Sequence, residues 1–201
     1  MTLKESKFYF LQDDCCEEFG TEAGKERYQK TEQRYQALQD EYQKEQNPAI
    51  REHLLRNLFP PLAYYQTLLS DGFSQQAALE FVEKETEKAA LQKKAAMKSM
   101  TRLPFTYLMY RLFVKKFMTK NFPTEGWETQ WLECSGTSIR FHLNRCLYWN
   151  ICQKEGCPEL CQVYCKNDDI AFAGLLPKIR FERSQTLGTG GTCCDFCFRK
   201  G

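Results

Sequence analysis

The chain has 201 residues, of which 42% are hydrophobic and 27% are charged. These values are close to those of ordinary globular proteins and exclude a disordered tail or a fibre. At about 150 residues per domain, the length suits one domain or two small ones. The 28 lysines and arginines against 26 acidic residues leave a net charge of +2. Because this charge is too small to attract a phosphate backbone, we expect no nucleic-acid partner.

No segment has the roughly 20 consecutive apolar residues that a membrane span needs. The best candidate, residues 103–118, is interrupted by Arg111, Lys115 and Lys116. The first ten residues also lack the apolar core of a signal peptide. We therefore expect a cytoplasmic protein without a membrane partner.

The first part of the chain has the pattern of helices. Residues 22–46 are polar with a thin apolar stripe and predict an exposed helix, which Asn47 and Pro48 end. Residues 50–62 again have helical spacing, with an interruption or kink at two adjacent prolines. Ser74 is a good N-cap for a helix that runs from residue 75 into the nineties. The strongest apolar stripe follows, and we expect it to pack in the core: Phe105, Leu108, Met109, Leu112, Phe113 and Phe117.

After residue 123 the hydrophobic period changes from about 3.6 to about 2. Segments 127–134 and 138–146 predict one hairpin, and segments 179–187 and 193–199 predict a second. Between them, Pro158 opens a short Cys-rich helical stretch. The fold class is therefore α+β, with N-terminal helices packed on a C-terminal antiparallel sheet of two hairpins separated by short Cys-rich helices. We expect a helical region over 1–122 and a Cys-rich region over 123–201, together forming one compact unit.

Cysteine is unusually frequent, with eleven in the chain and only Cys15 and Cys16 before residue 134. The odd number and the missing signal peptide favour reduced thiols over disulfides. A free cysteine is often a small buried hydrophobic residue, and this interpretation stays open for each of them. Cys157, Cys161 and Cys165 recur at every fourth residue, which on a helix would place three thiols on one face.

Two sets of residues could carry chemistry. Cys165 and Asp168 lie one helical turn apart, either as a buried thiol near a solvated carboxylate or as a nucleophilic or water-activating pair. Strand alternation places Arg145 and Arg183 at the ends of apolar faces. Each guanidinium either extends to water or clamps a carboxylate with its planar fork.

The C-terminal motifs resemble a known family. The segments EGCPELC (155–161), YCKND (164–168), FERSQTL (181–187) and GGTCCDF (190–196) are similar to the L-2-amino-thiazoline-4-carboxylic acid hydrolase family. The segment from Arg51 to Ser74 also resembles the N-terminal half of that family. The resemblance implies hydrolytic opening of a cyclic amidine or isothiourea, such as an aminothiazoline carboxylate, to a carbamoyl-cysteine.

The resemblance also implies roles for individual residues. Cys165 and Asp168 match the C-x2-D element and would be the reacting pair. Arg183 matches F-x-R and would clamp the substrate carboxylate, with Arg145 as second candidate. The remaining matches would line the pocket or hold the second hairpin: Thr186, Cys194 and Asp195. We expect Cys165 and Asp168 to face a shared, largely dry cavity with a guanidinium at its wall.

Two other functions stay open. The C-terminal region also resembles the small-molecule-binding domain named after vinyl reductases, which would make the protein a ligand sensor without catalysis. A third interpretation is a metal-dependent enzyme, with Cys146, Cys165 and Cys194 around zinc or iron and Asp168 acting on bound water. We expect a small-molecule substrate with a carboxylate, and association of copies through the N-terminal helices stays open.

Overall fold

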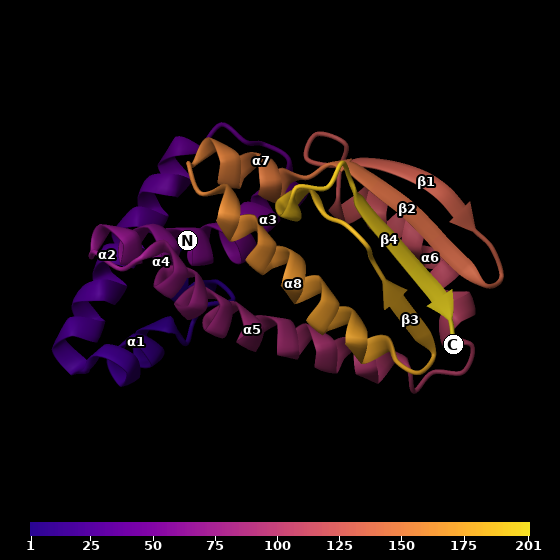
Figure 1. The fold of residues 1–201 in the computed structure, drawn as a ribbon, viewed down its shortest axis with the longest axis horizontal. Coiled ribbons are helices and arrows are strands. Elements are labelled where there is room, and N and C mark those ends of the chain that lie inside the picture. The colour runs from indigo at the N-terminus through magenta and orange to yellow at the C-terminus, as the bar shows by residue number, and fades with distance from the viewer. The chain divides into compact units, whose positions relative to one another are not determined.

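The computed structural model describes residues 1–201 and divides into two units, Met1–Ala89 and Ala90–Gly201 (Figure 1). The division falls inside one long helix, α5 (Gln75–Met100). Each unit is described by itself. The division of the sequence at residue 122 into a helical region and a Cys-rich region stays a prediction.

The N-terminal unit is made of helices: the short 3-10 helix η1 (Leu3–Glu5), α1 (Leu11–Phe19), α2 (Thr21–Glu41), α3 (Pro48–His53), the π-helical segment η2 (Leu54–Leu58), α4 (Phe59–Ser70) and the first part of α5. The predicted polar helix is confirmed as α2, which buries only a thin stripe that includes Tyr28, Tyr35 and Leu38. By contrast, α4 is buried on nearly every side.

Two predicted local signals in this unit have the expected structural effect. Pro60 and Pro61 lie in the first turn of α4, directly after the π-helical segment. Proline lacks the backbone N–H that an interior helical position needs, so the regular hydrogen-bond ladder changes there. Ser74 caps α5, because its Oγ accepts a hydrogen bond from the backbone N–H of Ala77 at 3.2 Å.

The C-terminal unit contains the sheet. In chain order its elements are the end of α5, α6 (Thr106–Asn121), β1 (Glu128–Cys134), β2 (Ser138–Arg145), α7 (Leu147–Lys154), η3 (Pro158–Leu160), α8 (Cys161–Phe172), η4 (Ala173–Leu175), β3 (Ile179–Glu182), η5 (Leu187–Thr189) and β4 (Cys194–Lys200). The strands are antiparallel in the order β1-β2-β4-β3. The two predicted hairpins and the α+β class are confirmed (Figure 1).

Aromatic side chains cover one face of the sheet. Phe141 on β2 stacks on Phe196 of β4, with ring centroids 5.1 Å apart. Phe172 of α8 lies 5.0 Å from Phe198 of β4, and Tyr110 of α6 lies 5.2 Å from the same ring. Most alternate residues on the other face are exposed or half-buried, as is usual for an antiparallel sheet with one packed face. Both α6 and α8 therefore pack on the same face.

The prediction for α6 is wrong about which side is buried. The expected apolar stripe is exposed, and the buried side consists of Thr106, Tyr107, Val114 and Met118. The inner side fits the sheet because its tyrosines combine an aromatic ring with a polar end. The Tyr107 hydroxyl donates a hydrogen bond to the Ser135 carbonyl at 3.1 Å. No helix of the protein has both the length and the apolar character needed to cross a membrane.

The second hairpin is shorter than predicted, because β3 ends at Glu182. Arg183 and Gln185 therefore do not lie on a strand face. The Asp195 carboxylate accepts hydrogen bonds from the backbone N–H groups of Ser184 and Gln185, which draws this segment out of the ladder. The predicted stripe of three thiols is also changed, since Cys157 precedes η3 and only Cys161 and Cys165 lie on α8.

Helix α2 crosses α1 closely at Gly24. A Cβ atom there would lie 2.5 Å from Cys16 Cα, which is shorter than any real contact. Gly24→Ala should therefore destabilise the protein by about 1–3 kcal/mol, although the same change in an open helix is favourable. The measurement is urea unfolding. Gly136→Ala is the control, since its nearest new contact is 3.9 Å away. Equal stabilities of the two variants would contradict the close crossing.

Candidate functional site

The predicted reacting pair lies on α8, where it faces the loop that follows β3. Cys165 and Asp168 are one turn apart on this helix, as predicted. Thr186 hydrogen-bonds with the Cys165 thiol, and Arg183 approaches Asp168 from the same loop. Cys194 lies in β4, and its Sγ accepts a hydrogen bond from the N–H of Leu187 at 3.3 Å. The fold thus gathers these side chains from α8, β4 and the connecting loop.

Arg183 is the central cation of the site. Its side chain is 7% exposed, and Nη2 donates to the Cys165 carbonyl at 2.9 Å and to Asp169 Oδ2 at 2.7 Å. Its Nη1 lies 3.7 Å from Asp168 Oδ2. The guanidinium carbon is 5.6 Å from the ring centroids of both Phe181 and Phe196. This buried charge is therefore compensated by two carboxylates and two aromatic faces.

Asp168 is the carboxyl suited to proton transfer. Loss of solvation raises its pKa from 3.8 to about 6, although Arg183 and Lys93 lower it. The side chain keeps 43% of its surface accessible, so a small molecule can reach it. A carboxyl that titrates near neutral pH can act as a general base and then as a general acid.

Cys165 is poorly suited to attack as a thiolate. Its hydrogen bond with Cys161 and its burial both raise its pKa, and the hydrogen bond with Thr186 lowers it only in part. The nucleophilic form of cysteine is the thiolate, so a thiol held protonated is a weak nucleophile. The raised pKa of the thiol counts against nucleophilic attack by Cys165, and both predicted roles of the pair stay predictions.

Cys165 lies at one end of a row of thiols whose other members are buried. Hydrogen bonds link Cys157 to Cys152, Cys152 to Cys161 and Cys161 to Cys165. In each of these pairs the hydrogen bond, together with burial, raises the pKa of the thiol that is named second. All eleven cysteines of the chain are free thiols.

The three predicted metal ligands do not form a ligand set. Cys146, Cys165 and Cys194 are close enough to affect one another electrostatically. Burial raises the pKa of Cys146 to about 12 and that of Cys194 to about 11. No group of three or more His, Cys, Asp or Glu side chains is arranged to hold an ion.

Two predicted site residues have other places or roles. Arg145 lies away from the reacting pair, and Asp195 has a structural role. Arg145 is exposed at the end of β2, where its guanidinium donates to the Thr124 carbonyl. Asp195 accepts hydrogen bonds from the Ser184 hydroxyl at 2.5 Å and from two backbone N–H groups of the same loop. Asp195 therefore holds the loop that carries Arg183, which is the second role predicted for it.

Three neighbours of Asp168 were not singled out from the sequence. The Asp168 charge adds to the effect of burial in raising the pKa of Tyr110 on α6 and of Tyr148 on α7. Lys93 of α5 is the second cation near the carboxyl. Tyr110 could have been found from its place on the α6 face opposite the apolar stripe, since a tyrosine among inward-facing residues usually needs a polar partner.

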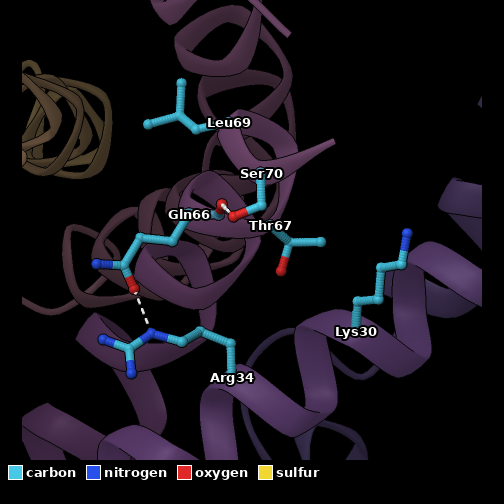
Figure 2. A pocket seen from close by; sticks show the side chains of 6 residues that line it. All are labelled: Lys30, Arg34, Gln66, Thr67, Leu69 and Ser70. Carbon is cyan, nitrogen blue, oxygen red and sulfur yellow. Dashed lines mark hydrogen bonds between the residues drawn. The ribbon is translucent and has the colours of Figure 1, made fainter. Parts of the chain in front are cut away.

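The two pockets described lie elsewhere. One of about 500 Å³ lies in the N-terminal unit between α2 and α4, lined by Lys30, Arg34, Gln66, Thr67, Leu69 and Ser70 (Figure 2). Its polar side chains are already engaged, with Arg34 Nε donating to Gln66 Oε1 at 2.6 Å. Neither pocket is lined by Cys165 or Asp168. The expectation of a shared, largely dry cavity beside Cys165 and Asp168 stays a prediction, and the Asp168 side chain is 43% exposed.

The Asp168 pKa predicts a pH effect on stability. Its folded-state value, about 6, lies above the ordinary value of 3.8, so the folded state holds this proton more tightly. The wild type should lose stability relative to Asp168→Asn as pH rises through this interval, and the difference should level off above it. Thermal unfolding of both proteins across the interval measures this. A difference that does not change with pH would contradict the raised pKa.

Comparison with known families agrees with the sequence motifs. A family model described as L-2-amino-thiazoline-4-carboxylic acid hydrolase matches residues 51–198, which include α8, β3, β4 and the loop between them. No curated protein and no solved structure matches the chain. The matched segment contains every residue placed in the site above and most of the chain. The chain belongs to the L-2-amino-thiazoline-4-carboxylic acid hydrolase family.

Proposed function

We propose that the protein is a hydrolase that opens a small cyclic amidine or isothiourea, such as an aminothiazoline carboxylate. The observation that carries this proposal is the accessible Asp168 carboxyl with a pKa of about 6, held beside Arg183. The family description supports the same type of reaction. In this proposal the Asp168 carboxyl transfers protons, and Cys165 does not act as a nucleophile.

In the proposed reaction, ionised Asp168 accepts a proton from a water molecule as its oxygen attacks the amidine-like ring carbon. The bond between this carbon and a ring heteroatom then breaks. The new hydroxyl loses its proton as it becomes the carbonyl. Asp168 thus relays both water protons, one to the amidine nitrogen that loses its double bond and one to the leaving heteroatom, so that one water is consumed and the carboxylate is restored. The neutral thiol of Cys165 contacts the substrate as a weak hydrogen-bond donor and forms no covalent bond with it.

The substrate carboxylate is bound by cations in this proposal. Arg183 points Nη1 toward Asp168, and its Nη2 donates to the Cys165 carbonyl and to Asp169 on α8. Lys93 adds a second positive charge near the same place. A carboxylate between them would replace part of the interaction that Arg183 makes with ionised Asp168.

Asp168→Asn should abolish most of the turnover of L-2-amino-thiazoline-4-carboxylate, since removing an acid–base group typically costs at least about a hundredfold in kcat. Asp40→Asn is the matched control, because it makes the same change at an exposed carboxylate of α2. It should retain most of the activity. Saturable binding by the wild type without turnover would instead favour the sensor interpretation.

Arg183→Lys should raise KM for the same substrate by about tenfold or more, because one ammonium cannot hold the Cys165 carbonyl and Asp169 and also donate to the substrate carboxylate. Steady-state kinetics measures KM and kcat separately. The control is Arg180→Lys on the exposed side of β3. An unchanged KM in Arg183→Lys would remove this residue from carboxylate binding.

A further inference from the structure

Helix α6 carries an exposed apolar face. We use the name α6 apolar face for five side chains of this helix: Leu108, Met109, Leu112, Phe113 and Phe117. Their exposed fractions are 43%, 44%, 59%, 55% and 55%, in that order. Just before the helix, Leu103 and Phe105 are 57% and 76% exposed. Large apolar side chains gathered in this way mark an interaction surface.

The charged residues of α6 and of the sequence before it are of one sign. No acidic residue lies between Glu87 and Glu125. The same stretch contains Lys88, Lys93, Lys94, Lys98, Arg102, Arg111, Lys115, Lys116 and Lys120. Lys88 is paired with Asp14 and Glu85. Lys93 acts on Asp168. Helix α6 itself carries Arg111, Lys115, Lys116 and Lys120 and no acidic residue, which gives it a positive potential.

Basic side chains also lie within the apolar face. Lys116 and Lys120 follow Leu112 by four and eight residues on a regular helix, so all three share one side. Both lysines are exposed. A lysine can lay its methylene chain along an apolar surface while its ammonium group reaches further out. The face therefore combines apolar side chains near the helix with cations at their margin.

A pocket continues this surface at the start of α6. It has a volume of about 400 Å³, and its lining includes Phe105 and Leu108 together with the side chains of Arg111, Lys178 and Lys200. No acidic side chain lines it. Cations next to exposed apolar residues match a ligand that has an anionic group attached to a hydrocarbon chain.

We propose that the C-terminal unit docks through α6 onto the surface of a bilayer that contains anionic phospholipids. The α6 apolar face enters the boundary between headgroups and acyl chains, and the surrounding lysines and arginines contact the headgroups. The helix lies on the membrane and does not cross it. The earlier expectation of no membrane partner rested on the missing span, which a helix in this position does not need.

A second copy of the chain is a poorer occupant of the same face. Pairing two α6 faces would bring Lys116 and Lys120 of both copies together in a partly dry interface. No acidic residue of the stretch could compensate them. Like charges at an interface oppose association, whereas an anionic bilayer neutralises them.

The test is flotation of the full-length protein with vesicles of phosphatidylcholine alone and of an equimolar mixture with phosphatidylserine. We expect binding to the mixed vesicles, weaker binding to the neutral ones, and release by added salt. Phe113→Ser should weaken binding at least about tenfold. Lys116→Gln and Lys120→Gln should each weaken it about fivefold.

Two control variants change similar residues elsewhere. Leu132→Ser alters a side chain that is 46% exposed on β1, and Lys44→Gln alters an exposed lysine of the N-terminal unit. Both should float like the wild type. Failure of the wild type to bind the mixed vesicles, or equal binding by all variants, would overturn the proposal. So would a dimer in sedimentation that Phe113→Ser abolishes, or a loss of thermal stability in that variant, since either would show that protein covers this face.

Discussion

The buried guanidinium of Arg183 is the interaction on which the C-terminal site depends. It joins the loop after β3 to α8 by donating to a backbone carbonyl and to Asp169, and it lies against two aromatic rings of the sheet. A cation removed from water needs such partners, because an unpaired buried charge is strongly destabilising. The position of the loop and the charge of the site are therefore set by the same side chain.

This constraint determines the chemistry available to α8. Because Arg183 is shared between two carboxylates, it only partly offsets the loss of solvation at Asp168, and the pKa of this carboxyl stays near neutrality. Arg183 only partly offsets the effect of burial on the pKa of Cys194, and mutual hydrogen bonds and burial raise the pKa of Cys161 and Cys165. The site is thus better suited to moving protons than to forming a covalent intermediate. Membership of a hydrolase family agrees with a site that transfers protons.

Much of the fold could be predicted from local signals. The hairpins follow from alternation, α5 begins at a capping serine, and Pro158 opens the helical stretch before α8. Local patterns could not decide which side of α6 is buried, because the helix has apolar residues on both sides and the choice depends on the shape of the sheet. The early end of β3 also depends on a distant residue, Asp195, which competes for its backbone.

The site was predictable only in part, because some of its residues come from elements that are distant in the sequence. Spacing on one helix was enough to bring Cys165 and Asp168 to the same side of α8, and the family motifs pointed to Arg183. Tyr110, Tyr148 and Lys93 come from three other helices, so no sequence spacing relates them to Asp168. The raised pKa of the carboxyl depends on how these neighbours displace water, which is a property of the assembled unit.

The row of thiols beneath the site affects the durability of the protein. Electrophiles and peroxides react with the thiolate form of cysteine, and hydrogen bonding and burial keep this form scarce at Cys152, Cys161 and Cys165. A Cys-rich interior of this kind should resist alkylation and oxidation as long as it stays folded. These cysteines then act as buried packing residues, and their alkylation or oxidation would show that the C-terminal unit had unfolded.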